Sequence, residues 1–178
     1  MKTFRILASA GLVASAVVLA SGVLSTVSWA APVKNCAPSH LKVSVGTAQG
    51  TAGTIYHPII VTNIGAAACA LWGVPGVQPV VGGATHSRVH VGPPARNLSM
   101  GEMPARQTLK PTHSLSDAFG VTESGNYTKS KCLPKNAGAI IVTLGNFVGH
   151  AYVPLKISVC TQRTSITTKL MVPGTTGY

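Results

Sequence analysis

Apolar and polar residues alternate along much of the chain beyond residue 40, in short runs that are separated by turn-forming residues. Leu41–Val45 alternates in this way. Ala151–Cys160 places four aliphatic side chains on one face and Lys156 and Ser158 on the other. A period of two residues is typical of strands that are buried on one side, and no segment of this region keeps the 3.6-residue apolar period of a helix. The pattern therefore predicts an all-β domain.

Further strands are predicted where β-branched and aromatic residues lie between Gly, Pro and Asn turns. These segments are 54–61, 69–72, 77–81, two short strands within 107–121 around Lys110-Pro111, 139–144 and 166–172. In the last of them, one face is expected to carry Ile166, Thr168, Leu170 and Val172. Many short strands joined by regular turns predict a sandwich or a barrel.

Two prolines and one long segment interrupt this pattern. Pro58 and Pro154 lie inside predicted strands, and because proline cannot donate to a β-ladder, each is expected on an edge strand or at a bulge. Gly82–Pro104 contains Gly, Pro, His and Met with little periodicity, which predicts a long loop with one short strand at Arg88–Val91. A loop of this length is often functional or mobile.

The first thirty residues have the organisation of a secretory signal peptide. Lys2 and Arg5 precede the long apolar run Ile6–Val27, and small residues before Ala31 favour cleavage after Ala30. The run is also long enough to span a bilayer, so an uncleaved anchor is the alternative. We expect a signal peptide at residues 1–30 and one domain at residues 31–178.

The cysteines predict an oxidising compartment. Four cysteines lie beyond the leader, an even number without the C-x-x-C spacing of metal sites, which favours two disulfides in an exported protein. Three pairings are possible. The sequential pairing, Cys36 with Cys69 and Cys132 with Cys160, is favoured and closes two loops of about 30 residues, worth about 3–4 kcal/mol each in the chain-entropy model.

The stretch from Thr62 to Gly76, TNIGAAACALWGVPG, has a structural interpretation at every position. Asn63 and Gly65 tolerate the positive φ that a tight turn needs. Cys69 can link the following strand to another segment, Trp72 supplies bulk near the core, and Gly73 lies at the next corner.

This stretch resembles a family of actinobacterial secreted domains of unknown function. The shared elements are T-N-x-G at residues 62–65 and C-x-L-x-G-x-P-G at residues 69–76. Residues 108–111 resemble the family's V-x-L-x-P-G element, but Thr112 stands where the family usually has glycine, so the resemblance does not fix the geometry of that turn. The resemblance covers residues 36–172. It implies an exported, immunoglobulin-like antiparallel sandwich with two cysteine pairs and no assigned activity.

The predicted domain is strongly basic. Beyond the leader, twelve Lys and Arg residues stand against Glu102, Asp117 and Glu123, which gives a net charge of +9. The basic residues are scattered, and only Lys129, Lys131 and Lys135 cluster. Charge alone indicates weak attraction to anionic surfaces, so no specific nucleic-acid partner is expected. Membrane association is expected only if the leader is retained.

Catalytic motifs are not recognisable in the sequence. Asp117 and Glu123 are the only neighbouring carboxylates, and they lie in or beside a polar segment typical of solvated turns. Ser39-His-Leu-Lys42 matches S-x-x-K, but a strand follows it and its partner motifs are missing. No cofactor is expected, and the sequence predicts a protein without enzymatic activity.

Histidine and methionine side chains in the long loop suggest the alternative of copper handling. Imidazole and thioether ligands suit copper, and the candidates are His86, His90, Met100 and Met103. His86 and His90 would lie close together on a helix, but on a strand they would be about 13 Å apart. The leading hypothesis is therefore an exported, non-enzymatic β-sandwich that binds an unidentified partner at the cell envelope through loops such as 82–104.

Overall fold

The computed structural model describes residues 32–82, 89–144 and 149–178. Residues 32–178 form one compact unit. The predicted leader lies outside the described residues, so both its cleavage and the anchor alternative stay predictions. Among the described residues, no helix has the length and apolar character needed to cross a membrane.

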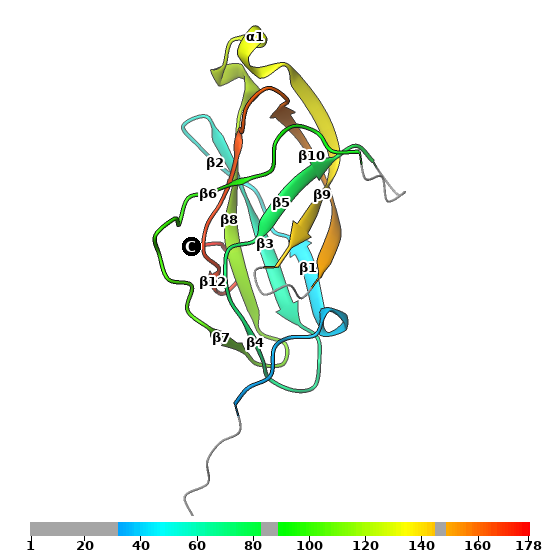
Figure 1. Cartoon of the computed structure of the whole chain (residues 1–178), viewed down its shortest axis with the longest axis vertical. Helices are drawn as coiled ribbons and strands as arrows, with labels where there is room; N and C mark the ends of the chain where they lie inside the picture. Colours follow the sequence, from blue (N-terminus) through cyan, green and yellow to red (C-terminus); the bar gives the residue numbers. More distant parts are fainter. Residues whose placement is uncertain (1–31, 83–88, 145–148) are drawn as a thin grey trace, which may run out of the picture. The chain divides into compact units, whose positions relative to one another are not determined.

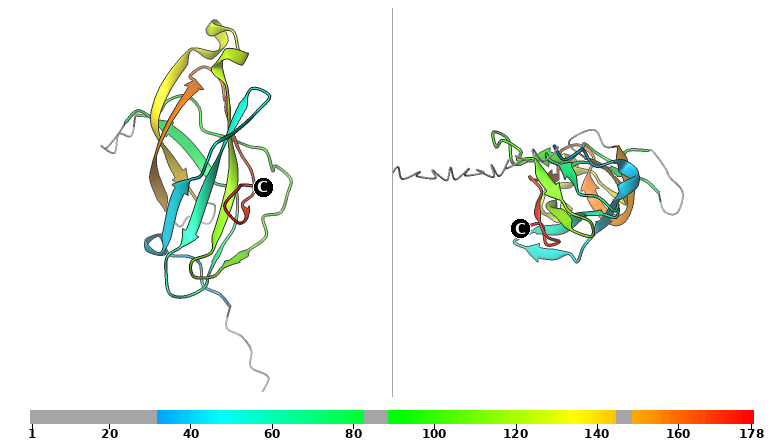
Figure 2. Two further views of the ribbon diagram at one scale, coloured as in Figure 1. Left: turned by 180° about the vertical axis from the view of Figure 1, so that it is seen from behind. Right: turned by 90° about the horizontal axis from the view of Figure 1, so that it is seen from below.

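The unit is all-β, as the alternation predicts, and its main sheets form a sandwich (Figures 1 and 2). The larger sheet has the order β1-β3-β8-β11-β6, with β2 paired to β3 and β12 paired to β8. The second sheet has the order β10-β9-β5, and β4 pairs with β7. The strands are β1 (Leu41–Val45), β2 (Gln49–Thr51), β3 (Thr54–Asn63), β4 (Cys69–Leu71), β5 (Gly76–Val80), β6 (Arg96–Asn97), β7 (Gln107–Leu109), β8 (Ser114–Thr122), β9 (Pro134–Thr143), β10 (His150–Cys160), β11 (Ile166–Thr168) and β12 (Val172–Pro173). Short helical turns are η1 (Pro38–His40), η2 (Ser124–Asn126) and α1 (Lys129–Cys132). The immunoglobulin-like arrangement implied by the resemblance stays a prediction.

The core lies between the inner faces of the two main sheets. Fully buried aliphatic and aromatic side chains come from both sheets, and each contributes about 1.5–3 kcal/mol on burial. The larger of them are Ile59, Val61, Phe119, Ile140, Val142 and Ile166. The period-two pattern that predicts the strands therefore also identifies most of the core.

Strand β8 is buried on both faces. Phe119 points into the core, whereas Ser116 and Ala118 lie on the opposite face under the C-terminal segment. The Gly177 amide donates to Ser116 Oγ at 2.9 Å, and a Cβ on Gly177 would lie 2.8 Å from the Ala118 nitrogen. Only glycine fits this close approach, so the C-terminal segment packs directly on the sheet.

Of the two prolines that are expected on an edge strand or at a bulge, only Pro154 meets the expectation. Pro154 is in β10, the edge of its sheet, and a register shift follows it between Pro154 and Ile157. Pro58 is in β3, which is interior and pairs with β8 without a register shift at this point, so the prediction of an edge strand or a bulge is wrong for it. The Pro58 carbonyl accepts from Gly46 N at 2.8 Å, and in an antiparallel strand the nitrogen of a residue lies on the same side as its carbonyl. On that side, Pro58 falls in the gap between the residues that pair with β1 and those that pair with β2. The missing N–H therefore costs no ladder bond.

Two other strand predictions need correction. The predicted strand 166–172 is split into β11 and β12, and beyond Thr168 the buried side chain is Met171 rather than Leu170. At the break, Lys169 N donates to the side-chain Oδ1 of Asp117 in β8 at 2.7 Å instead of to a backbone carbonyl of that strand. Arg88 of the predicted strand 88–91 lies outside the described residues, and in the remainder an isolated bridge joins His90 to Val80. The two-residue strand β6 follows it.

Asn63 joins three segments at one end of the sandwich, by a mechanism that the sequence interpretation missed. Neither Asn63 nor Gly65 has a positive φ. The Nδ2 atom of the buried Asn63 side chain instead donates to the carbonyls of Ala67 and Leu109, both at 2.9 Å. The Oδ1 atom of the same side chain accepts from Gly65 N at 2.9 Å. A Cβ on Gly65 would lie 3.0 Å from His40, which explains the glycine there by packing.

The sulfur atoms are paired in the sequential arrangement. Cys36 bonds Cys69 and Cys132 bonds Cys160, with sequence separations of 33 and 28 residues. The first disulfide fixes the segment before η1 to β4, next to the hydrogen bond from Ala70 N to the Lys34 carbonyl at 2.7 Å. The second fixes α1 to the end of β10.

Thr112, which stands where the resembling family has glycine, adopts the left-handed conformation with φ of 65°. Its amide donates to the Asn63 carbonyl at 2.8 Å in the β7–β8 turn. A β-branched residue is strained in this region of backbone space, so the turn keeps the glycine conformation without the glycine.

We predict that Thr112→Gly stabilises the domain. Relief of left-handed strain, about 1–2 kcal/mol, exceeds the added chain entropy of glycine, about 0.5–1 kcal/mol. Urea unfolding should therefore show a gain of about 0.5–1 kcal/mol. Thr108→Gly, at an exposed position of β7 with ordinary backbone, is the matched control and should destabilise. A loss of stability in both variants would contradict the assignment of strain.

Asp117 is a carboxyl group inside the sheet. Its side chain has 0% exposure, Oδ1 accepts the Lys169 amide, and Oδ2 has no hydrogen-bond partner among the described residues. Burial raises the pKa of Asp117 from 3.8 to about 7, against the smaller opposing effects of the Lys169 amide and ammonium. The side chain is therefore largely protonated in the folded state at mildly acidic pH.

We predict that Asp117→Asn flattens the pH dependence of stability between pH 4 and 7. In this window the folded protein keeps a proton that the unfolded chain releases, so the unfolding free energy falls as pH rises, by at most about 1.4 kcal/mol per pH unit. Guanidinium unfolding at pH 4, 5.5 and 7 checks this. The difference between wild type and variant cancels every other titrating group, and a pH-independent difference would overturn the prediction.

Candidate functional site

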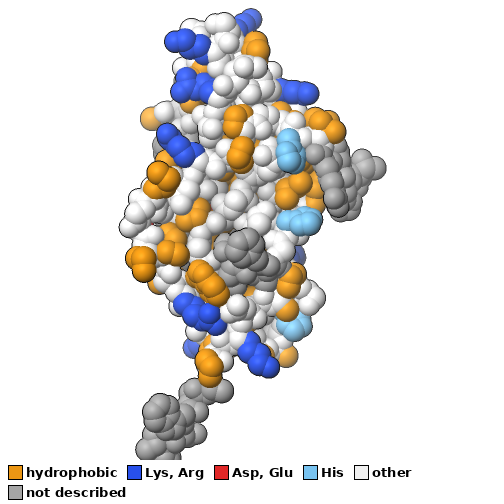
Figure 3. Space-filling model, in the orientation of Figure 1, with side chains coloured by type: hydrophobic (Ala, Val, Ile, Leu, Met, Phe, Trp, Pro, Cys, Tyr) orange, Lys and Arg blue, Asp and Glu red, His pale blue; other side chains and the backbone are white. Residues whose placement is uncertain are grey.

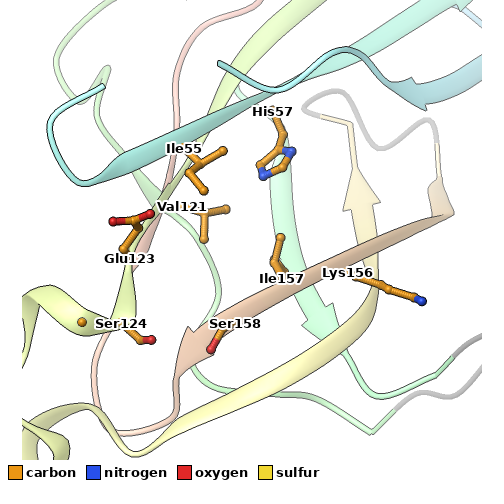
Figure 4. Close-up of a pocket in the computed structure, with 9 residues that line it drawn as sticks. Ile55, His57, Val121, Glu123, Ser124, Lys156, Ile157 and Ser158 are labelled. Atoms are coloured by element: carbon orange, nitrogen blue, oxygen red, sulfur yellow. The ribbon is translucent and has the colours of Figure 1, made fainter. Parts of the chain in front are cut away.

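An open pocket of about 430 Å³ lies between the larger sheet and the edge strand β10. Strands β3 and β8 form one wall, residues 156–158 of β10 form the opposite wall, and η2 closes one end (Figure 4). The pocket therefore has walls from both main sheets.

Aliphatic side chains form the walls of this pocket. Ile55 and Val121 are directly paired across β3 and β8, so their side chains lie on the same face of the sheet. Ile157 faces them from β10 and is 8% exposed. These three side chains offer an apolar surface to a ligand.

His57 is the titratable group that points into this space, as Figure 4 shows. It follows Ile55 by two residues and is therefore on the same face of β3. Its ring packs against Phe119, with ring centroids 6.5 Å apart. Burial lowers the pKa of His57 below 6.5, so the imidazole is neutral at physiological pH and can donate one hydrogen bond and accept another.

Polar groups lie around the opening of the pocket. Ser124 and Ser158 provide hydroxyl groups, and Glu123 is exposed at one edge. Lys156 lines the rim, but its side chain extends away from the pocket (Figure 4). The arrangement suits binding of an aliphatic group with an uncharged polar head, because the nearby carboxylate of Glu123 disfavours an anionic one.

A second hollow of about 490 Å³ adjoins the pocket and shares residues 156–158 with it. Its remaining lining includes Val81, Gly82, Asn136 and Gly138. Gly138 is packed against the Gly82 backbone, and a Cβ there would overlap the Gly82 carbonyl. This hollow lacks the convergent aliphatic side chains of the first.

The proposed copper ligands are only partly described. His86 lies outside the described residues, and His90 is exposed on the segment that bridges to β5. Met100 and Met103 are 80% and 90% exposed, so packing does not hold either thioether in place. No group of three His, Cys, Asp or Glu side chains able to hold a metal occurs in the described segments.

The carboxylate pair and the S-x-x-K match do not form sites. Asp117 is buried in β8 against the Lys169 amide, whereas Glu123 is exposed beyond the end of the strand. Ser39 lies in the three-residue η1 and Lys42 lies in β1. The serine therefore does not open the α-helix that the penicillin-recognising motif requires.

The strand pattern contains a signal for the pocket that the sequence interpretation did not use. His57 lies two residues from both Ile55 and Ile59 and therefore shares their face of the strand. Asp117 shares a face with Leu115 and Phe119 in the same way, so each polar residue stands at a core-facing position. A polar residue at such a position is either satisfied by hydrogen bonds or placed beside a cavity. The structure shows the first case for one oxygen of Asp117 and the second for His57.

The architecture defines a disulfide-bonded β-sandwich domain with an open surface pocket. The chain belongs to the family described as Domain of unknown function (DUF4232), whose model matches residues 36–173. No curated protein matches the chain. The resemblance to a family of unknown function is thus confirmed, whereas its actinobacterial origin and its cysteine motif stay predictions.

We predict that the His57 imidazole titrates at a pKa below 6.5. Its Hε1 proton resonance, assigned by its loss in His57→Gln, should show a midpoint below that of a histidine-containing peptide measured in the same buffer. The physical reason is that burial disfavours the charged ring. A midpoint at or above the peptide value would contradict the buried placement of the ring.

Proposed function

We propose that this chain is an exported, non-enzymatic binding module that holds the aliphatic part of a ligand between β3, β8 and β10. One observation carries the proposal: aliphatic side chains from both sheets and the neutral His57 imidazole converge on the same open space of about 430 Å³. Apolar pockets with a few polar groups are the usual form of small-ligand sites. The hydroxyl groups of Ser124 and Ser158 provide the polar contacts.

The signal-like N-terminus and the two disulfides support an extracytoplasmic location for this module. The ligand is then a component of the envelope or of the extracellular medium, with a short aliphatic body and an uncharged polar head. The pocket, rather than the loop at residues 82–104, supplies the recognition surface. The described part of that loop is partly engaged, because Val91 N and Ala95 N donate to carbonyls of β5, both within 2.9 Å.

We predict that Gly125→Trp blocks this pocket. Gly125 lines it, a Cβ there meets no atom within 4 Å, and its φ is not in the left-handed region, so the indole can enter the opening without backbone strain. Proton–nitrogen NMR of the oxidised domain should show 1-hexanol shifting the amides of β3, β8 and β10 at the pocket. The substitution should weaken this binding at least fivefold.

Ser130→Trp is the matched control, because it adds the same indole at an exposed position of α1 outside the pocket. It should leave hexanol binding unchanged. Hexanoate should bind more weakly than hexanol, because its carboxylate approaches Glu123. Equal binding of hexanol to both tryptophan variants, or shifts confined to other regions, would refute the pocket as the site.

A further inference from the structure

Basic side chains gather at the end of the domain that contains α1. Lys129 and Lys131 lie in α1, Lys135 lies at the start of β9, and Arg163 lies in the turn after β10. All four are exposed, and we call this group the basic tip. Figure 3 shows Lys and Arg side chains at this end and no Asp or Glu on the same face.

The fold holds the basic tip together. The Cys132–Cys160 disulfide joins α1 to the end of β10. The amides of Thr161 and Gln162 donate to the Cys132 carbonyl at 2.9 and 3.3 Å, which brings the turn containing Arg163 next to α1. The cations therefore come from segments nearly thirty residues apart and are positioned by covalent and backbone bonds.

These cations are not neutralised within the part of the chain that the structure describes. None of the four forms an ion pair there. The guanidinium of Arg163 lies 4.4 Å from the centroid of the Tyr127 ring, which orients the charge without cancelling it. The tip therefore presents a positive field to the solvent.

Leu133 places an apolar side chain in the middle of this field. It lies between Lys131 and Lys135, has φ of 44°, and is 49% exposed. Its backbone is fixed, because its amide donates to the Lys129 carbonyl at 2.8 Å and its carbonyl accepts from Thr161 Oγ1 at 2.9 Å. A rigid backbone thus holds an exposed leucine among cations.

We propose that the basic tip docks on an anionic phospholipid surface, with Leu133 entering the interface between headgroups and acyl chains. Basic residues are attracted to anionic headgroups, and an apolar side chain beside them adds burial on insertion. A soluble polyanion would be held by the charges alone and would gain nothing from Leu133. The combination therefore favours a lipid surface, and this site is separate from the pocket proposed above.

The test uses the oxidised domain of residues 32–178, which contains the core, both disulfides and every described strand. Sedimentation with vesicles of phosphatidylcholine alone, or with about 30% phosphatidylglycerol, measures binding. Each lysine near such a surface contributes about fivefold, so K129Q/K131Q/K135Q should weaken binding to the anionic vesicles by about 100-fold. Salt of about 1 M, which shortens the screening length to about 3 Å, should abolish binding.

K34Q/K42Q/K110Q is the matched control, because it removes the same charge nearer the end of the domain that contains β4 and β7 (Figure 1). It should weaken binding less than fivefold. Equal losses in the two triple variants would overturn the proposal, because binding would then follow net charge rather than the tip.

Leu133→Asn separates a lipid surface from a soluble polyanion, since asparagine tolerates the left-handed backbone while removing the apolar side chain. It should weaken binding to the anionic vesicles at least threefold and leave retention on a heparin column unchanged. Unchanged vesicle binding would overturn the role of Leu133 and show a general polyanion site. Circular dichroism of each variant, matching that of wild type, confirms that the comparison is made between folded proteins.

Discussion

The pairing of β3 with β8 is the constraint on which the larger sheet depends. Residues 54–62 pair in order with residues 122–114. The other strands of the sheet attach to this ladder: β1 and β2 to β3, β11 and β12 to β8, and β6 through β11. Asn63 terminates the ladder and fixes its register, because its backbone exchanges hydrogen bonds with Thr112 and His113 of the turn before β8. A shift of one residue would place Ile59 and Phe119 on the wrong face.

The pocket lies beside interruptions in the strand pairing on both of its walls. His57 precedes Pro58, at the point where β3 passes from its pairing with β2 to its pairing with β1. On the opposite wall, Ile157 follows the register shift after Pro154. The same prolines that disturb the strand pattern thus mark the location of the pocket.

The sequence predicts strands well here because most of them have one buried face. Such strands show alternating apolar and polar residues, which is the pattern used for the prediction. It fails where polar side chains replace backbone partners, as when Asp117 accepts the Lys169 amide and the last strand divides, moving Met171 rather than Leu170 into the core. Asn63 is predicted in a turn but is the last residue of β3, and its role is to bond three segments rather than to adopt a positive φ. The pocket as a whole and the place of Arg163 in the basic tip could not be predicted, because these residues meet their neighbours only through long-range strand pairing and a disulfide. The three lysines of the tip, by contrast, are already close together in the sequence.

Sequential disulfides have a consequence for how the domain is assembled. Neither bridge crosses the connection between β6 and β7, so a cut near residue 101 would yield two pieces, each with its own cystine and with no covalent link between them. All three sheets contain strands from both pieces: β3 meets β8, β5 meets β9, and β4 meets β7. Two such fragments would therefore have to reassociate through strand pairing in every sheet, which makes the domain suited to fragment complementation.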